Sequence, residues 1–253
     1  MKAEGHGTEN GESLLIGLQS MKRRSKKKKQ ALPHMESLNK NVSDVQCLLD
    51  IASRRKLNAE KRILRQSAVV LFTASWEAYI EDLATASFKF LTKNATSSNK
   101  LPDSVKRHVV KRLEASKDPL TYWQLAEGGW KETLRLYARD IVDGSLAHVN
   151  TPNNKIADEM FEKLIGLKNL SNSWQWRGTT HKEVKKRLTK YITLRGQIAH
   201  RNSSEKMITT RSVQQYIEFI FRLAVMSNNT VVIYLQKVTG KEPWRKWVYG
   251  KTS

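Results

Sequence analysis

The stretch A-V-V-L-F-T-A-S-W, residues 68–76, is apolar on nearly every side of a helix. It lies inside a longer segment with helical spacing, residues 58–93. Apolar side chains continue along one face of this segment at i, i+3, i+4 and i+7, as Trp76, Tyr79, Ile80 and Leu83. A helix that is apolar all round must be covered by other helices. The stretch therefore predicts a long central helix in a helical bundle.

Helical spacing recurs through most of the remaining chain. We expect further helices from Glu36 to Ala52 and over residues 102–115, 130–142, 156–167, 180–202 and 210–236. Loops are expected over residues 94–100, 144–154 and 171–179, which carry turn residues and little periodicity. No segment shows the strict alternation of a strand, so the sequence predicts an all-α protein.

Composition divides the chain into three expected parts. Residues 1–34 form a disordered basic N-terminal tail, because the run K-R-R-S-K-K-K-K at 22–29 repels itself and cannot bury a core. This division makes His6 and His34 tail residues. The tail can serve as a nucleic-acid arm, as a nuclear-import address, or only as solvated chain. A helical domain follows over residues 35–240, and residues 241–253 form a basic C-terminal extension.

Charge is the strongest global signal. The chain has 45 basic and 24 acidic residues, a formal net charge of +21. The first 34 residues hold eight Lys or Arg and three Glu, so +16 belongs to the rest of the chain. Such a balance favours polyanionic partners, with nucleic acid first and an acidic membrane surface second.

Cysteine usage and hydropathy narrow the class of protein. Cys47 is the single cysteine, which excludes an internal disulfide and a Cys-rich zinc site and fits a reducing compartment. No apolar run approaches the ~20 residues of a membrane span. His, Cys and carboxylates do not cluster as metal ligands do. We therefore expect a cytoplasmic protein without membrane association, bound metal or cofactor.

The segment from Thr180 to Asn202 carries the candidate chemistry. Thr180 followed by Glu183 is a capping-box helix start. One apolar arc of this helix consists of Val184, Leu188, Tyr191, Ile192, Ile198 and Ala199. Arg195 falls near the middle of that arc, where a lone charge is costly and needs a partner, a cleft or an interface. His200 follows five residues later, where the helix should end.

Two interpretations of this pair remain open on the residues alone. His200 and Arg195 can form a functional site. Alternatively, His200 caps the last carbonyls of the helix and Arg195 pairs with a carboxylate such as Glu77 or Glu81.

Two motifs resemble a known family. R-G-Q-I-A-H-R at 195–201, in the penultimate long helix, is similar to the Arg-x(4–6)-His signature of the HEPN superfamily. A-S-W-E-A-Y-I-E-D-L at 74–83 is similar to the first-helix signature of its RiboL-PSP-like branch, and Pro243-Trp244 near the end also matches. The resemblance runs from about Val45 to Trp244 and implies a HEPN-like bundle with long antiparallel helices and inserted short helices.

The same resemblance implies an activity. HEPN members pair as homodimers, and in active members Arg and His of both protomers line an interface cleft that cuts RNA without a metal. For this chain it implies Arg195 and His200 as catalytic residues and RNA as the substrate. It also implies a role in toxin–antitoxin or antiphage defence, with an antitoxin or regulatory protein as a further partner.

Two features of this chain bear on that expectation. Many active members place a polar residue directly after the Arg, where this chain has Gly196, although Gln197 next to it can substitute. Residues five apart on an ideal helix point about 140° apart. Arg195 and His200 can therefore meet only if the helix unwinds near Ala199, or across a dimer.

Other residues are candidates for supporting roles. Glu77, Glu81, Gln197 and Asn202 can orient the catalytic pair, although surface carboxylates also form ordinary ion pairs. RNA-backbone contacts are expected from Lys182, Lys185, Lys186 and Arg201, with a solvated basic face as the alternative. Trp174, Trp176, Trp244 and Trp247 lie among cations and can stack on bases, but packing in the core or a dimer is the favoured interpretation.

The sequence thus predicts a metal-independent HEPN-type endoribonuclease. Two other functions fit the same features: a catalytically inactive HEPN-like module that binds RNA or protein, and a DNA-binding protein whose basic helix lies on the duplex.

Overall fold

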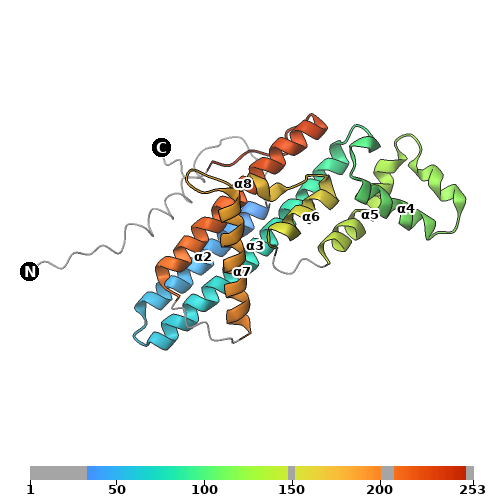
Figure 1. Ribbon diagram of the computed structural model, residues 1–253. Helices are drawn as coiled ribbons and strands as arrows, with labels where there is room; N and C mark the ends of the chain where they lie inside the picture. The colour runs from blue at the N-terminus through green and yellow to red at the C-terminus, as the bar shows by residue number, and fades with distance from the viewer. Residues whose placement is uncertain (1–32, 148–151, 201–207, 249–253) are drawn as a thin grey trace, which may run out of the picture.

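The computed structural model describes residues 33–147, 152–200 and 208–248 (Figure 1). These ranges are helical, apart from connecting loops and an isolated bridge between Trp176 and Thr179. The α-helices are α2 (Pro33–Arg54), α3 (Asn58–Asn94), α4 (Asp103–Glu114), α5 (Gly129–Leu146), α6 (Asn154–Ile165), α7 (His181–Ala199) and α8 (Thr210–Thr239). Short 3-10 helices cover η1 (Ser98–Lys100), η2 (Pro119–Leu125) and η3 (Leu170–Ser173). The all-α prediction is confirmed.

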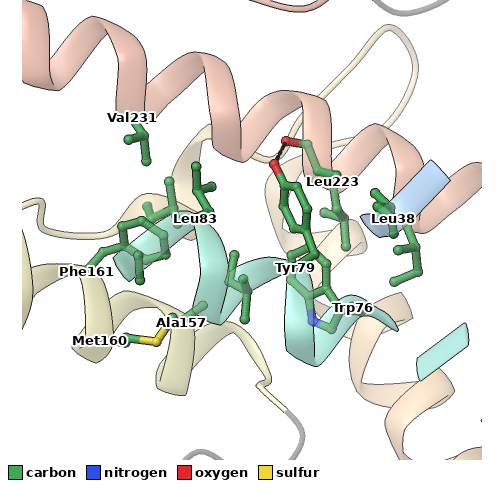
Figure 2. Packing of buried hydrophobic residues seen from close by; sticks show 14 of the residues in the cluster. Leu38, Trp76, Tyr79, Leu83, Ala157, Met160, Phe161, Leu223 and Val231 are labelled. Carbon is green, nitrogen blue, oxygen red and sulfur yellow. Dashed lines mark hydrogen bonds between the residues drawn. The ribbon is translucent and has the colours of Figure 1, made fainter. Parts of the chain in front are cut away.

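Helix α3 lies at the centre of the bundle, as the apolar stretch at 68–76 predicts. It packs against α2, α5, α6, α7 and α8. Trp76 at its middle is fully buried. The indole Nε1 of Trp76 donates a hydrogen bond to the carbonyl of Pro152 at 2.9 Å, and its ring forms an edge-to-face pair with Trp174. Figure 2 shows Trp76 next to Tyr79 among the buried side chains of the core. The helix is thus held from several sides by contacts distant in sequence.

Helices α3 and α8 run in the same direction. Three side-chain contacts between them keep a nearly constant offset: Arg65 with Thr210, Thr73 with Tyr216, and Tyr79 with Ala224. Helix α2 runs antiparallel to α3, to which a short turn joins it (Figure 1). The N-terminal ends of α3 and α8 therefore lie side by side, next to the α2–α3 turn.

The prediction that His34 belongs to the tail is wrong. Helix α2 begins at Pro33, a residue favoured at the first position of a helix. His34 is 1 % exposed and lies against the rings of Tyr79 and Trp244. The lysine run obscures this start, because nothing local to residue 34 reveals that two distant aromatic rings cover it. Residues 1–32 lie outside the described ranges.

Some details of the helices also differ from the prediction. Residues 144–146, expected in a loop, complete α5, because Gly144 weakens a helix without ending it. Residues 170–173 form η3 within the expected loop at 171–179. Helix α8 continues to Thr239 and ends at Gly240, whose φ of 73° lies in the left-handed region that favours glycine at a helix C-terminus.

The segment after α8 lies along this helix. The side chain of Asn229 accepts a hydrogen bond from the Trp247 backbone N–H and donates one to the Trp247 carbonyl, both at 2.7 Å. Trp244 donates from its indole to Asn228 at 2.8 Å. Trp174 and Trp247 are buried, and Trp176 and Trp244 pack against the core. The packing interpretation of these four tryptophans is therefore confirmed.

No helix in the described part of the chain is both long enough and apolar enough to cross a membrane.

Candidate functional site

Helix α7 starts as its sequence predicts. The Thr180 hydroxyl accepts a hydrogen bond from the Glu183 backbone N–H at 3.3 Å, and the Glu183 carboxylate accepts one from the Thr180 N–H at 2.7 Å. The Thr180 N–H and hydroxyl both donate to the Glu183 carboxylate, and these two bonds lower the pKa of Glu183 because they stabilise its charged form. Val184 and Leu188 follow at 0 % exposure and anchor the first half of α7 to the bundle.

The apolar arc of α7 is less buried in the second half of the helix. Tyr191, Ile192 and Ile198 are only half-buried, and Ala199 is exposed. Arg195 lies on this same face and is itself half-buried. Within the described ranges, the structure records no hydrogen bond or ion pair for its guanidinium. The arginine that the sequence places on the inward-facing arc therefore lies where the described residues leave that arc only half-buried.

His200 lies at the end of α7 and is exposed. Its backbone N–H donates to the Gly196 carbonyl at 3.0 Å, which is the ordinary spacing of an α-helix. The helix therefore does not unwind near Ala199. Helical geometry then leaves the side chains of Arg195 and His200 on different faces, with His200 on the outward face that also carries Lys182 and Lys186.

Helix α7 crosses α8 toward the N-terminal end of α8. Trp174 bonds to Ser227, and farther along the chain Arg187 lies over Phe219 and Tyr191 stacks on Tyr216. Each step along α7 thus brings it nearer to Thr210, where α8 begins. The end of α7 points toward the end of the bundle that holds the α2–α3 turn (Figure 1).

An aromatic and polar cluster holds α7 at this crossing. Tyr191 and Tyr216 stack with ring centroids 4.0 Å apart. The Tyr216 hydroxyl pairs with Thr73 of α3 at 2.8 Å, and Arg187 donates to the Tyr191 hydroxyl at 3.2 Å. Sequence reasoning did not identify this cluster; its only local signal is the i, i+4 spacing of Arg187 and Tyr191. The cluster positions the helix one turn before Arg195.

Glu77 lies beside this cluster. Burial raises the pKa of Tyr216, and the nearby carboxylate of Glu77 contributes in the same direction. The Oε1 atom of Glu77 is buried and has no hydrogen-bond partner among the described residues. Burial also raises the pKa of Glu81, with further contributions from Glu77 and Asp82. Within the described ranges, the structure records no ion pair between Arg195 and Glu77 or Glu81.

A family model named RiboL-PSP-HEPN matches residues 36–232. The chain belongs to this family. Comparisons with curated proteins and with solved structures find no match. Membership suggests a nuclease or RNA-binding role, because HEPN domains are often ribonucleases.

The other predicted site residues of this HEPN domain differ in their exposure and in their contacts. Lys182, Lys186 and Gln197 are exposed on α7. Lys185 instead donates a hydrogen bond to Asn172 at 2.7 Å, so it also braces the preceding loop. Arg201 and Asn202 lie outside the described residues. Within the described part of the chain, no three His, Cys, Asp or Glu side chains gather as metal ligands do.

Replacing Gly196 with alanine tests how open the end of α7 is in this HEPN domain. A Cβ built at Gly196 meets no atom within 4 Å, and Gly196 is not among the residues with positive φ. Alanine should therefore raise the free energy of unfolding by about 0.5–1 kcal/mol through helix propensity alone. Urea denaturation measures this change. A loss of stability would indicate that a neighbouring molecule fills the space beside Gly196 in solution.

Proposed function

We propose that this protein is a metal-independent endoribonuclease whose active site forms where the α7 helices of two copies meet. The observation that carries the proposal is the half-exposed apolar arc at the end of α7, which holds an arginine without a partner in the described residues. A second copy would cover Tyr191, Ile192 and Ile198 and would also bring a second arginine and a second histidine to the same place.

A dimer also resolves the geometry of the pair. One continuous helix points Arg195 and His200 about 140° apart. Two-fold symmetry can place the histidine of one copy beside the arginine of the other without unwinding either helix. The two protomers together then supply two histidines, so that one can take a proton while the other gives one.

The chemistry follows from these residue types. A neutral imidazole takes the proton from a ribose 2′-OH, whose oxygen attacks the adjacent phosphorus. The bond from phosphorus to the 5′-oxygen breaks, and an imidazolium donates a proton to that leaving oxygen. Guanidinium groups bind the phosphate oxygens and stabilise the charge that builds in the transition state. The products are a 2′,3′-cyclic phosphate and a 5′-OH.

Glu77 and Gln197 are assigned supporting roles in this proposal. The buried Oε1 of Glu77 lacks a donor among the described residues, and an unpaired buried carboxylate oxygen is costly. A donor on the second copy or on bound RNA would remove that cost. Gln197 can offer its amide to phosphate in place of the polar residue that Gly196 does not provide.

The biological role is proposed from the family resemblance. The proposed role is in toxin–antitoxin or antiphage defence, in the cytoplasm. An antitoxin or another regulatory protein would restrain the ribonuclease.

Incubation with total RNA in excess EDTA tests the proposal. Cleavage should persist, because no step needs a metal, and the fragments should carry 2′,3′-cyclic phosphates and 5′-OH ends. Treatment of the fragments with polynucleotide kinase, followed by electrophoresis and mass analysis, identifies those ends. A wild-type protein that binds RNA but cuts none under any condition would exclude the ribonuclease activity.

The inactive RNA- or protein-binding module is retained as a second candidate because of Gly196. The space beside this residue is open, so the absence of a polar side chain is not forced by packing. If the module is inactive for this reason, wild-type protein binds RNA without cutting it, and Gly196→Asn restores cleavage. Tighter binding of duplex DNA than of RNA in the same assay would instead favour the DNA-binding alternative.

A further inference from the structure

A cluster of cations lies at the turn between α2 and α3. Residues 50–65 contain six basic and two acidic side chains. The basic residues are Arg54, Arg55, Lys56, Lys61, Arg62 and Arg65. We call this cluster, together with Arg211 of α8, the basic corner. Neither the catalytic pair nor the predicted RNA-binding lysines of α7 belong to it.

The fold brings Arg211 to the other six. Helices α3 and α8 are parallel, so their N-terminal ends lie together. The guanidinium Nε of Arg65 donates to the hydroxyl of Thr210 at 3.2 Å, which fixes the first turn of α8 beside α3. Arg211 is the next residue and is exposed.

Stability explains only part of the basic corner. Arg65 bonds to Thr210, and Arg54 lies in the last turn of α2, where the helix dipole favours a cation. Arg55 reaches Glu60 only at 4.0 Å, and Arg54, Lys56 and Arg62 are exposed and form no ion pair within the described ranges. Lys61 and Arg211 lie in the first turns of α3 and α8, where the positive end of the helix dipole disfavours a cation. A bound polyanion would relieve both the mutual repulsion and this unfavourable placement.

The composition of the corner favours phosphate recognition over general solubility. Five of its seven cations are arginines, although lysines outnumber arginines 28 to 17 in the whole chain. Arginine holds phosphate oxygens in a bidentate fork, which lysine cannot do. Residues 103–147, by contrast, have nearly balanced charge, with eight basic and seven acidic side chains, and ion pairs such as Arg112 with Asp140 at 3.0 Å join some of them.

We propose that the basic corner binds the sugar–phosphate backbone of single-stranded RNA that extends from the cleavage site at the end of α7. The inference rests on the proposed function, because it takes RNA as the ligand. Contacts along α7 move toward the start of α8, so the end that carries Arg195 and His200 approaches the same end of the bundle as the corner. RNA leaving that site would meet the corner next.

An anionic membrane surface is the competing ligand. Leu57 and Ile63 are 63 % and 55 % exposed among the corner cations, as in proteins that insert apolar side chains between lipid headgroups. RNA is favoured because the corner lies at the same end of the bundle as the candidate cleavage site. The experiment below includes both ligands.

The test compares two variants of the full-length protein with equal net charge. The corner variant carries Arg54→Gln, Lys56→Gln, Arg62→Gln and Arg211→Gln. The control variant carries Arg107→Gln, Lys111→Gln, Lys117→Gln and Lys131→Gln, all exposed and all in the balanced region 103–147. The probe is a 20-nucleotide single-stranded RNA with 2′-O-methyl riboses, which cannot undergo 2′-OH attack. Circular dichroism and thermal melting verify that both variants fold.

The expected result is a local effect on affinity and on its salt dependence. Single-stranded contacts contribute about 0.7 to the slope of log affinity against log salt, so the corner variant should lose up to about 3 of that slope. Its affinity at 100 mM salt should fall about tenfold or more, and the control variant should stay within about threefold of wild type. Equal losses in the two variants, or no loss in either, would overturn the proposal.

Two further comparisons distinguish RNA from an anionic membrane as the ligand, and the proposal for the basic corner from the ribonuclease proposal. Sedimentation with phosphatidylserine vesicles overturns RNA binding at the corner if the corner variant loses the vesicles but keeps the RNA. If wild-type protein cuts no RNA and the corner variant still loses affinity for the probe, the ribonuclease proposal fails and RNA binding at the corner stands. If wild-type protein cuts RNA and the corner variant binds the probe as tightly as wild type, the ribonuclease proposal stands and RNA binding at the corner fails.

Discussion

Alanine at Arg195 or at His200 should lower the rate of RNA cleavage by about 10²–10⁴-fold, the usual effect of removing a general acid–base group or a donor to a transition-state charge. The fold should survive either change. His200 is exposed, and Arg195 forms no ion pair or hydrogen bond within the described residues. Initial rates on a fluorescent RNA in EDTA give the activity, and urea denaturation gives the free energy of unfolding.

Mixing the two variants tests whether the site is shared between copies. In a dimer of one Arg195→Ala chain and one His200→Ala chain, the first copy still provides His200 and the second still provides Arg195. A site built across the interface therefore regains one complete Arg–His pair but only one of its two histidines, so the mixture should exceed either variant alone and stay below wild type. A site built within one chain regains nothing, because neither copy holds both residues.

Thr193→Ala is the matched control for these variants. Thr193 is exposed on α7 two residues before Arg195, and no role is assigned to it. Its rate should stay within about threefold of wild type, since a surface change away from the site has little effect. Full activity in both Arg195→Ala and His200→Ala would exclude them as the catalytic pair, whatever the mixture does.

Local patterns predicted much of the fold because the apolar and capping residues of a few helices indicate where those helices begin and which faces are buried. Residues 68–76 are apolar all round, and α3 is the central helix. Thr180 and Glu183 form the predicted capping box. His34 shows the limit of such patterns. Its burial depends on Tyr79 and Trp244, which lie far away in the sequence, and no helical period near residue 34 records them.

The candidate site was partly predictable for the same reason. The period of α7 places Arg195 on the inward arc, and the structure agrees. The helical period does not reveal that the arc is less buried after Leu188, because that burial depends on where α3 and α8 lie beneath α7. The nearness of Glu77 to Tyr216 and of Arg65 to Thr210 likewise follows only once the parallel packing of α3 and α8 is known.

Acid should destabilise this protein through His34. Burial lowers the pKa of His34 from 6.5 to about 4. The groups that face its ring are Tyr79 of α3, Asn228 of α8 and Trp244, none of which is charged between pH 4 and 7. The folded protein therefore keeps this imidazole neutral over a range in which the unfolded chain protonates it.

The direction in which pH changes the free energy of unfolding follows from the difference between the folded and unfolded pKa of His34. Because the folded pKa lies below the unfolded one, the stability is fully present above pH 6.5 and is lost as the pH falls toward 4. Linkage gives a loss of about 2 kcal/mol between pH 7 and pH 5, and of about 3 kcal/mol in all once the pH is below 4. Urea denaturation at pH 7 and at pH 5 measures the free energy of unfolding at each.

His34→Gln isolates this contribution from the acid titration of carboxylates. The variant differs from wild type by some free energy of unfolding at pH 7. At pH 5 the destabilisation of the variant relative to wild type should be about 2 kcal/mol smaller, because the variant has no imidazole to protonate. The surroundings of His34 explain why the folded protein keeps its imidazole neutral. Nδ1 has no hydrogen-bond partner among the described residues, and Nε2 lies 3.4 Å from an Asn228 oxygen that already accepts from Trp244. A proton added to Nδ1 would find no acceptor. Equal pH dependence in wild type and His34→Gln would mean that the imidazole reaches an acceptor or water after all.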